Sequence, residues 1–72
     1  MSIENRVSRI ISKHVGTRPK DIAPDDIIDL YGLDSLSKVE IIMELEAEFG
    51  MDIDATESEH WETVNDIIEY ID

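Results

Sequence analysis

The chain has 72 residues, which is enough for one small domain, and it carries a formal net charge of −12 at pH 7. This charge disfavours nucleic acids and anionic membranes as partners, and the lack of cysteine excludes disulfide bonds. No apolar stretch approaches the roughly 20 residues that cross a bilayer. The first residues also lack the apolar segment of a signal peptide, so we expect a cytoplasmic protein with a single domain over residues 1–72.

The charge is distributed unevenly along the sequence. Residues 1–20 contain five basic residues and one acidic residue, whereas residues 21–72 contain 17 acidic residues and one basic residue, Lys38. A surface rich in carboxylates attracts proteins with basic patches and increases the rate at which they associate. Solubility alone would be an equally simple explanation of the charge.

The first predicted element is an amphipathic helix between Ser2 and Gly16. Its apolar positions follow the spacing of one helix face and are Ile3, Val7, Ile10, Ile11 and Val15. Ser2 can cap the start of this helix, and Gly16 can adopt the left-handed conformation that ends it.

A long loop is expected from Thr17 to Leu33, because this segment contains Pro19, Pro24 and Gly32 and shows no sustained periodicity. Loops of this length in compact domains are usually functional or disordered. We expect its apolar residues to hold it against the core; they are Ile22, Ile27, Ile28, Leu30 and Leu33.

Three helices are predicted after this loop. The first runs from about Ser35 to Phe49 and is ended by Gly50. A capping box at Thr56-x-x-Glu59 predicts a brief helix, and Thr63-x-x-Asp66 begins a last helix. The apolar face of the last helix consists of Val64, Ile67, Ile68 and Ile71. No segment alternates with period two, so we predict an all-α fold, a small four-helix bundle of three longer helices and one short helix, with a long loop between helices 1 and 2.

The helix over Ser35–Phe49 has apolar residues on two opposite faces, given about 100° of rotation per residue. One face contains Ile41, Ile42, Leu45 and Phe49, and the other contains Leu36, Val39, Met43 and Ala47. Glu40 and Glu44 border the second face on one side and Glu46 borders it on the other. Either both faces are buried, or the second is an exposed landing site for partners. We favour the landing site, because so small a bundle cannot easily bury both faces.

The tripeptide Asp34-Ser35-Leu36, at the junction of the long loop and this helix, resembles the signature of acyl carrier proteins. The resemblance extends through the second helix in Val39, Glu40, Met43, Leu45, Glu46, Glu48 and Phe49. The first helix is also similar to the family in Ile3-Glu4, Arg6-Val7 and Ile10-Ile11. The last helix is similar to it in Thr63-Val64 and Ile68-Glu69-Tyr70-Ile71. It therefore covers nearly the whole chain.

The resemblance implies that a separate transferase esterifies the Ser35 oxygen with 4′-phosphopantetheine from coenzyme A, and that Asp34 helps engage this transferase. The face read by partner enzymes would consist of Leu36, Val39, Glu40, Met43, Glu44 and Glu46. Independently, a serine at a helix N-terminus lies beside unpaired N–H groups that suit a phosphodiester. The alternative is that Ser35 or Asp34 is only an N-cap.

The implied function is that of a non-catalytic carrier, which holds acyl intermediates as thioesters in fatty-acid, polyketide or a related specialised pathway. Its partners would be the transferase and the acyl-loading and acyl-transferring enzymes, which carry basic docking patches, and the carrier itself would be a monomer. Two alternatives stay open. One is an aminoacyl or peptidyl carrier, although such carriers usually have a glycine where this chain has Leu33. The other is an acidic helical interaction module without a cofactor.

The chain also departs from the family pattern. Ser37 is neutral where the family often has an acid, and Lys38 lies near the core face, where its ammonium would have to extend outward. A lysine there argues against sequestration of a long acyl chain in the bundle. Together with the extra Tyr31 and the unusual Trp61, it favours a specialised carrier.

No metal site is predicted. The segment from Asp52 to Thr56 resembles the start of a calcium loop, but Glu57 and Thr63 stand where that loop requires glycine and glutamate. His14 and His60 lack the ligand spacing of a zinc site, so we interpret both as surface or packing residues.

Overall fold

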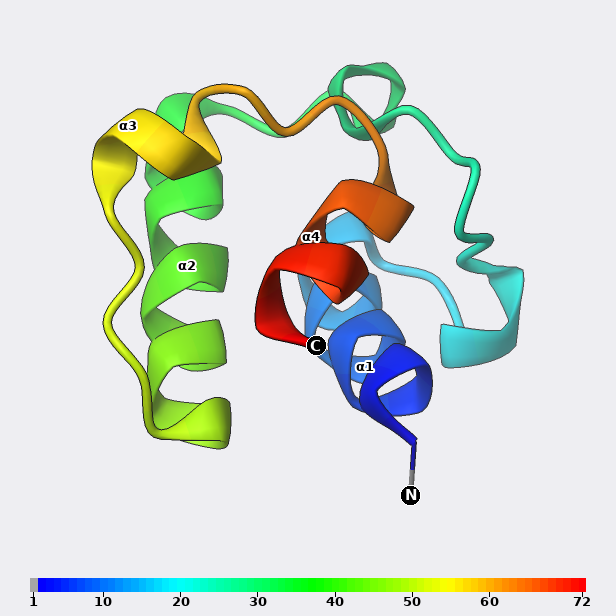
Figure 1. Ribbon diagram of the computed structural model, residues 1–72. Coiled ribbons are helices and arrows are strands. Elements are labelled where there is room, and N and C mark those ends of the chain that lie inside the picture. Colours follow the sequence, from blue (N-terminus) through cyan, green and yellow to red (C-terminus); the bar gives the residue numbers. More distant parts are fainter. Residues whose placement is uncertain (1) are drawn as a thin grey trace.

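The computed structural model describes residues 2–72, which form four α-helices and two short 3₁₀ turns. The helices are α1 (Ile3–Val15), α2 (Ser35–Phe49), α3 (Ala55–Ser58) and α4 (Val64–Ile71), and the turns are η1 (Pro19–Asp21) and η2 (Ile28–Tyr31). In Figure 1, α1 and α4 lie together, α2 stands beside them, and α3 lies near the N-terminal end of α2. Within the described residues there is no strand beyond one isolated bridge, so the all-α prediction is confirmed.

Helix α1 begins and ends where its sequence predicts. The Ser2 hydroxyl accepts a hydrogen bond from the Asn5 N–H at 3.1 Å, which satisfies one of the free donors of the first turn. Gly16 ends the helix with a φ of 83°, a left-handed conformation that costs glycine little because it has no Cβ atom. Its N–H donates to the Ser12 carbonyl at 2.9 Å.

The core lies where α1, α2 and α4 meet, and residues from two connecting segments complete it. Its buried apolar residues are Val7, Ile10, Ile11, Ile22, Ile41, Leu45, Ile53, Val64 and Ile67. Burying one such side chain stabilises a fold by about 1.5–3 kcal/mol. The predicted core face of α2 is confirmed by Ile41 and Leu45, with Ile42 and Phe49 packed at its edge.

The loop between α1 and α2 is held to the core by fewer residues than predicted. Ile22 is buried, and Ile28 and Leu33 pack against the core, but Leu30 is 80% exposed and Ile27 is 47% exposed. The predictions for Ile27 and Leu30 were therefore wrong. In the 3₁₀ turn η2, residues three apart share one face, so Ile28 and Tyr31 turn inward together and Leu30 turns outward.

The polar contact beneath this turn fixes its orientation. Tyr31 Oη donates to Asp26 Oδ2 at 2.8 Å, and the same oxygen accepts the Ala23 N–H at 2.9 Å. These two hydrogen bonds lower the pKa of Asp26, while burial and the neighbouring Asp26 carboxylate raise the pKa of Tyr31. The extra tyrosine thus serves as an anchor for the loop.

The caps of the last two helices differ in how well the sequence predicted them. Helix α3 is capped by Asp54, which accepts the Thr56 N–H at 3.1 Å, and so the predicted capping box at Thr56 was wrong. At α4 the Thr63 hydroxyl accepts the Asp66 N–H, and the Asp66 carboxylate accepts the Thr63 N–H at 3.0 Å. The second predicted box is therefore complete.

Candidate attachment site and exposed helix face

Ser35 is the first residue of α2, and the residue before it caps the helix. Asp34 has an extended backbone, and its Oδ1 accepts the Ser37 N–H at 2.7 Å. This backbone hydrogen bond is the main reason why the pKa of Asp34 is lowered. Because Asp34 supplies the cap, the exposed Ser35 hydroxyl is not needed to satisfy the helix end.

This helix end fits a phosphodiester on Ser35. The first N–H groups of an α-helix have no intrahelical acceptor, and the helix dipole places partial positive charge at the same end. Asp34 Oδ1 accepts the Ser37 N–H, and the Asp34 carboxylate also interacts with the Leu36 N–H, so this helix end already holds one negatively charged group beside the Ser35 oxygen. An exposed serine in this position is accessible to another enzyme and suits a covalently bound phosphate.

One face of α2 carries large apolar side chains in contact with solvent. Leu36 is 66% exposed, Val39 51% and Met43 61%, and Ala47 is also exposed. We call these four residues the exposed face of α2. Of the two sequence interpretations, burial of both faces is excluded, because only the face containing Ile41 and Leu45 enters the core.

The three glutamates beside the exposed face differ in their contacts. The Glu40 side chain is half exposed, with His14 Nδ1 at 3.9 Å. Glu44 accepts Lys13 Nζ at 2.9 Å and contacts His14 Nε2 at 3.0 Å; the hydrogen bond from Lys13 is the largest cause of its lowered pKa. Glu46 accepts the Ile53 N–H at 2.8 Å. Of the three, Glu40 has the carboxylate most available to a partner.

Leu30 is an exposed apolar residue that sequence reasoning assigned to the core. It lies in η2, five positions before Ser35, and is the most exposed large apolar residue of the described chain. The 3₁₀ spacing that pairs Ile28 with Tyr31 was the signal that could have revealed it.

Lys38 extends outward as predicted. Its ammonium lies 3.0 Å from Asp29 Oδ1, and the two residues sit at a cavity of about 400 Å³. The apolar lining of this cavity consists of Ile11, Ile28, Leu33, Ile41, Ile42, Trp61 and Ile67. Trp61 is held there edge to face against Tyr70, with ring centroids 5.5 Å apart. The bundle therefore has an apolar space with one ion pair among its lining residues.

The chain is thus a small helical bundle with an exposed serine at the start of its second long helix, an arrangement compatible with a carrier domain. A family profile described as "Phosphopantetheine attachment site" matches residues 5–71. The chain is 44% identical to an acyl carrier protein of Desulforapulum autotrophicum over 99% of this chain and 95% of that one. It thus belongs to the acyl carrier protein family, which implies a covalently attached 4′-phosphopantetheine cofactor.

A solved structure with the same fold is a free-standing peptidyl carrier protein from an Acinetobacter baumannii secondary metabolic pathway. It superposes with a TM-score of 0.80 and is 25% identical, over 94% of this chain and 85% of that chain. None of the helices among residues 2–72 is long and apolar enough to cross a membrane.

Proposed function

We propose that this protein carries acyl groups on a phosphopantetheine arm esterified to Ser35 and presents them to partner enzymes without catalysing a reaction itself. When attached, the arm supplies a thiol that holds the cargo as a thioester. The observation that carries the proposal is the exposed Ser35 hydroxyl at the start of α2, beside the cap made by Asp34. The match of residues 5–71 to the attachment-site family supports a single carrier domain over residues 1–72.

Attachment requires that Ser35 be presented and not that it be activated within this chain. The bond that forms joins Ser35 Oγ to the phosphorus of coenzyme A that bears the pantetheine arm. The bond that breaks releases the adenosine bisphosphate part, and the proton of the hydroxyl passes to a base on the transferase. Because the hydroxyl is exposed, an external enzyme has access to it. We propose that Asp34 is the acidic residue that the transferase recognises next to this hydroxyl.

Docking of partners is assigned to the exposed face of α2. Leu36, Val39 and Met43 supply apolar contact area, and the flexible Met43 thioether suits partners of different shape. Glu40 supplies a carboxylate for a basic patch on the partner. Glu44 and Glu46 add negative charge at the border, but their carboxylates also hold α1 and the Ile53 backbone. Their main contribution to docking is therefore to fix the shape of this face.

The cargo belongs to fatty-acid, polyketide or a related specialised pathway, with the specialised one favoured. The ion pair of Lys38 with Asp29 beside the apolar cavity supports this preference, because a buried long chain would have to pass a solvated charge pair. An aminoacyl or peptidyl cargo is the second candidate, supported by the likeness to a peptidyl carrier structure. The discriminating measurement is which purified loading enzyme, acyl transferring or amino-acid adenylating, transfers cargo to the arm-bearing protein. A cytoplasmic location stays a prediction of the sequence.

The test of attachment is the intact mass after incubation with coenzyme A and a broad-specificity phosphopantetheinyl transferase. Wild type and the control Ser37→Ala should each gain one phosphopantetheine, because the variant removes a hydroxyl that only supports the Asp34 cap and keeps the Ser37 N–H that Asp34 Oδ1 accepts. Ser35→Ala should gain none. A folded wild type that gains no mass would favour the cofactor-free interaction module, and a Ser35→Ala variant that still gains mass would place the arm elsewhere.

A further inference from the structure

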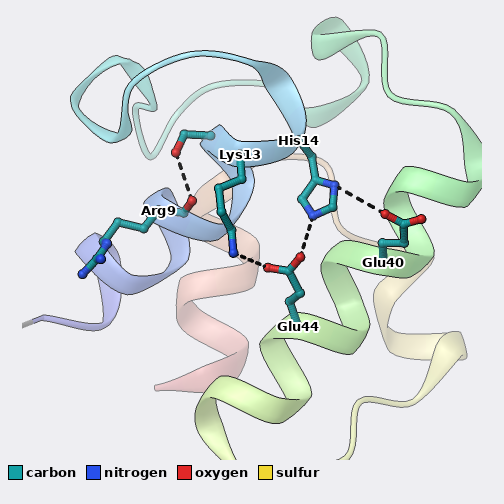
Figure 2. A network of polar contacts seen from close by, with 6 residues as sticks. Arg9, Lys13, His14, Glu40 and Glu44 are labelled. Atoms are coloured by element: carbon teal, nitrogen blue, oxygen red, sulfur yellow. Dashed lines mark hydrogen bonds and ion pairs between the residues drawn. The ribbon is translucent and has the colours of Figure 1, made fainter.

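His14 lies between two carboxylates that come from the neighbouring helix. It is in the last turn of α1, and Figure 2 shows its ring pointing toward Glu40 and Glu44 of α2. The Nε2 atom is 3.0 Å from Glu44 Oε1, and the Nδ1 atom is 3.9 Å from Glu40 Oε2. The His14 side chain is 13% exposed, whereas that of Glu40 is 51% exposed. The imidazole is thus fixed in place, while Glu40 remains free to turn toward solvent.

The two ring nitrogens have different roles in this geometry. A neutral imidazole that donates from Nε2 to Glu44 has a lone pair and no hydrogen at Nδ1. In this form it has no hydrogen-bond donor for the Glu40 carboxylate. A second proton places an N–H and a positive charge at Nδ1, on the side of Glu40. Imidazole is the side chain that changes charge between pH 5 and 8.

The charged groups around His14 come from both helices. Glu40 and Glu44 face His14 from α2. Lys13, the residue before His14 on α1, also contacts Glu44, with its Nζ atom 2.9 Å from Glu44 Oε2. Since Lys13 and His14 Nε2 already occupy the Glu44 carboxylate, the hydrogen gained at Nδ1 has Glu40 as its acceptor. Protonation of His14 therefore changes mainly the contact that its ring makes with Glu40.

We propose that His14 is a positioning residue for docking: its doubly protonated form binds the Glu40 carboxylate and withdraws it from the basic patch of a partner enzyme. This inference rests on the proposed role of Glu40 at the exposed face of α2. The carboxylate is available to the partner when His14 is neutral, and it is retained by α1 when His14 is doubly protonated. Because the competing contact is half exposed, we expect an effect on docking of about two- to fivefold.

The first measurement is a pH titration of the apo protein by NMR, with the side-chain carboxyl carbons of Glu40 and Glu44 observed from pH 8 to pH 5. In wild type the Glu40 signal should shift with the same midpoint as the His14 ring. In His14→Gln this inflection should vanish, because the amide can donate to Glu44 but cannot take a second proton. His60→Gln is the matched control, since His60 is exposed and is the only other histidine.

The second measurement is the kcat/KM of the transferase for each variant at pH 7.5 and pH 6.0. The ratio of wild type to His14→Gln removes the transferase's own pH dependence, and this ratio should fall about two- to fivefold at the lower pH. In a Glu40→Gln background the ratio should be the same at both pH values. A ratio that stays constant with pH in the wild-type background, or that falls equally in the Glu40→Gln background, overturns the proposal.

The two measurements separate the inference from the function on which it rests. If no variant accepts the arm at any pH while all remain folded, the carrier proposal fails. If the arm is accepted and Glu40 shows no inflection linked to His14, only the positioning role fails. Should His14→Gln not fold, Glu40→Gln alone tests the idea, because it must remove the acid-induced loss of kcat/KM relative to the His60→Gln control.

Discussion

The ammonium of Lys38 lies 3.0 Å from the carboxylate of Asp29, and both residues line the apolar cavity to which α1, α2, α4 and η2 contribute. The aliphatic stem of Lys38 therefore faces apolar side chains, while its charge is satisfied toward solvent. An ion pair as exposed as this one contributes little to the free energy of unfolding, typically about 0–1 kcal/mol. We expect its main consequence to be on which groups enter the cavity.

Replacing Lys38 with methionine should make the cavity more receptive to an acyl chain. The variant keeps a side chain of similar length but removes a charge that must stay hydrated. We expect the unloaded protein to change in unfolding free energy by less than about 1 kcal/mol. An octanoyl group on the arm should raise the melting temperature of Lys38→Met more than that of wild type. Lys20→Met, in the exposed turn η1, is the control, and equal shifts in all three proteins would contradict this role of Lys38.

The two apolar faces of α2 should respond oppositely to truncation. Leu45 is fully buried, so Leu45→Ala should destabilise the fold by about 2–5 kcal/mol, as cavity-forming substitutions do. Leu36→Ala and Leu30→Ala remove exposed side chains and should change stability by less than about 0.5 kcal/mol. Urea unfolding measures the first quantity, and the transferase kcat/KM measures docking. A docking role for the exposed face requires that Leu36→Ala lower the transferase kcat/KM without lowering stability.

Much of the fold follows from local sequence signals. Helix ends at Ser2, Gly16, Gly50 and Thr63 were predictable because each cap depends on one or two residues nearby in sequence. The side-chain directions within the long loop were not predicted. Those of Leu30 and Tyr31 depend on a 3₁₀ turn, whose spacing differs from that of an α-helix.

The same distinction holds for the candidate site. The position of Ser35 at a helix start could be predicted from spacing and caps, and the exposure of Leu36, Val39 and Met43 was favoured over burial because the bundle is small. The use of Glu44 by Lys13 and His14 could not, because it depends on how α1 and α2 lie against each other. The basic residues of the first helix, which the sequence showed only as a charge asymmetry, also pair across this contact: Arg6 Nε lies 2.8 Å from Glu48.

Two substitutions of Asp34 should separate helix capping from recognition. Asparagine caps helices about as well as aspartate, so Asp34→Asn should keep most of the stability, whereas Asp34→Ala loses the cap and should be the less stable of the two. If the charge of Asp34 engages the transferase, both variants should lose kcat/KM. Full activity in Asp34→Asn at unchanged stability would assign Asp34 to the cap alone.

Stability should pass through a maximum as the pH falls from 7. Hydrogen bonds to the folded carboxylates hold the pKa values of Asp26, Asp34 and Asp66 below the ordinary 3.8. A carboxyl with a lowered folded pKa contributes its stability above the ordinary value and loses it as the pH falls below about 4. The loss of negative charge on acidification acts in the opposite sense, because it relieves repulsion.

We therefore expect the melting temperature to rise from pH 7 toward pH 5 and to fall below pH 4. The variant Asp66→Asn should lower it at pH 7 and weaken the decline in acid, because the Glu62 and Thr63 N–H groups then lose a charged acceptor. Circular dichroism across the pH series measures both. A melting temperature that falls steadily from pH 7 would contradict a dominant role of charge repulsion.

Salt should stabilise the protein at pH 7. Residues 21–72 carry 17 acidic side chains and one basic one, and their mutual repulsion opposes the compact state. Raising the ionic strength from 0.01 M to 1 M shortens the screening length from about 30 Å to about 3 Å. The same screening weakens the pairs Arg6–Glu48 and Lys13–Glu44, but exposed pairs contribute little and the acidic excess is far larger. Each 1 kcal/mol of repulsion removed should raise the melting temperature by about 4–8 °C. Millimolar Mg²⁺ should act in the same direction at much lower ionic strength. A melting temperature that stays constant across both series would show that repulsion among the acidic side chains does not destabilise the fold.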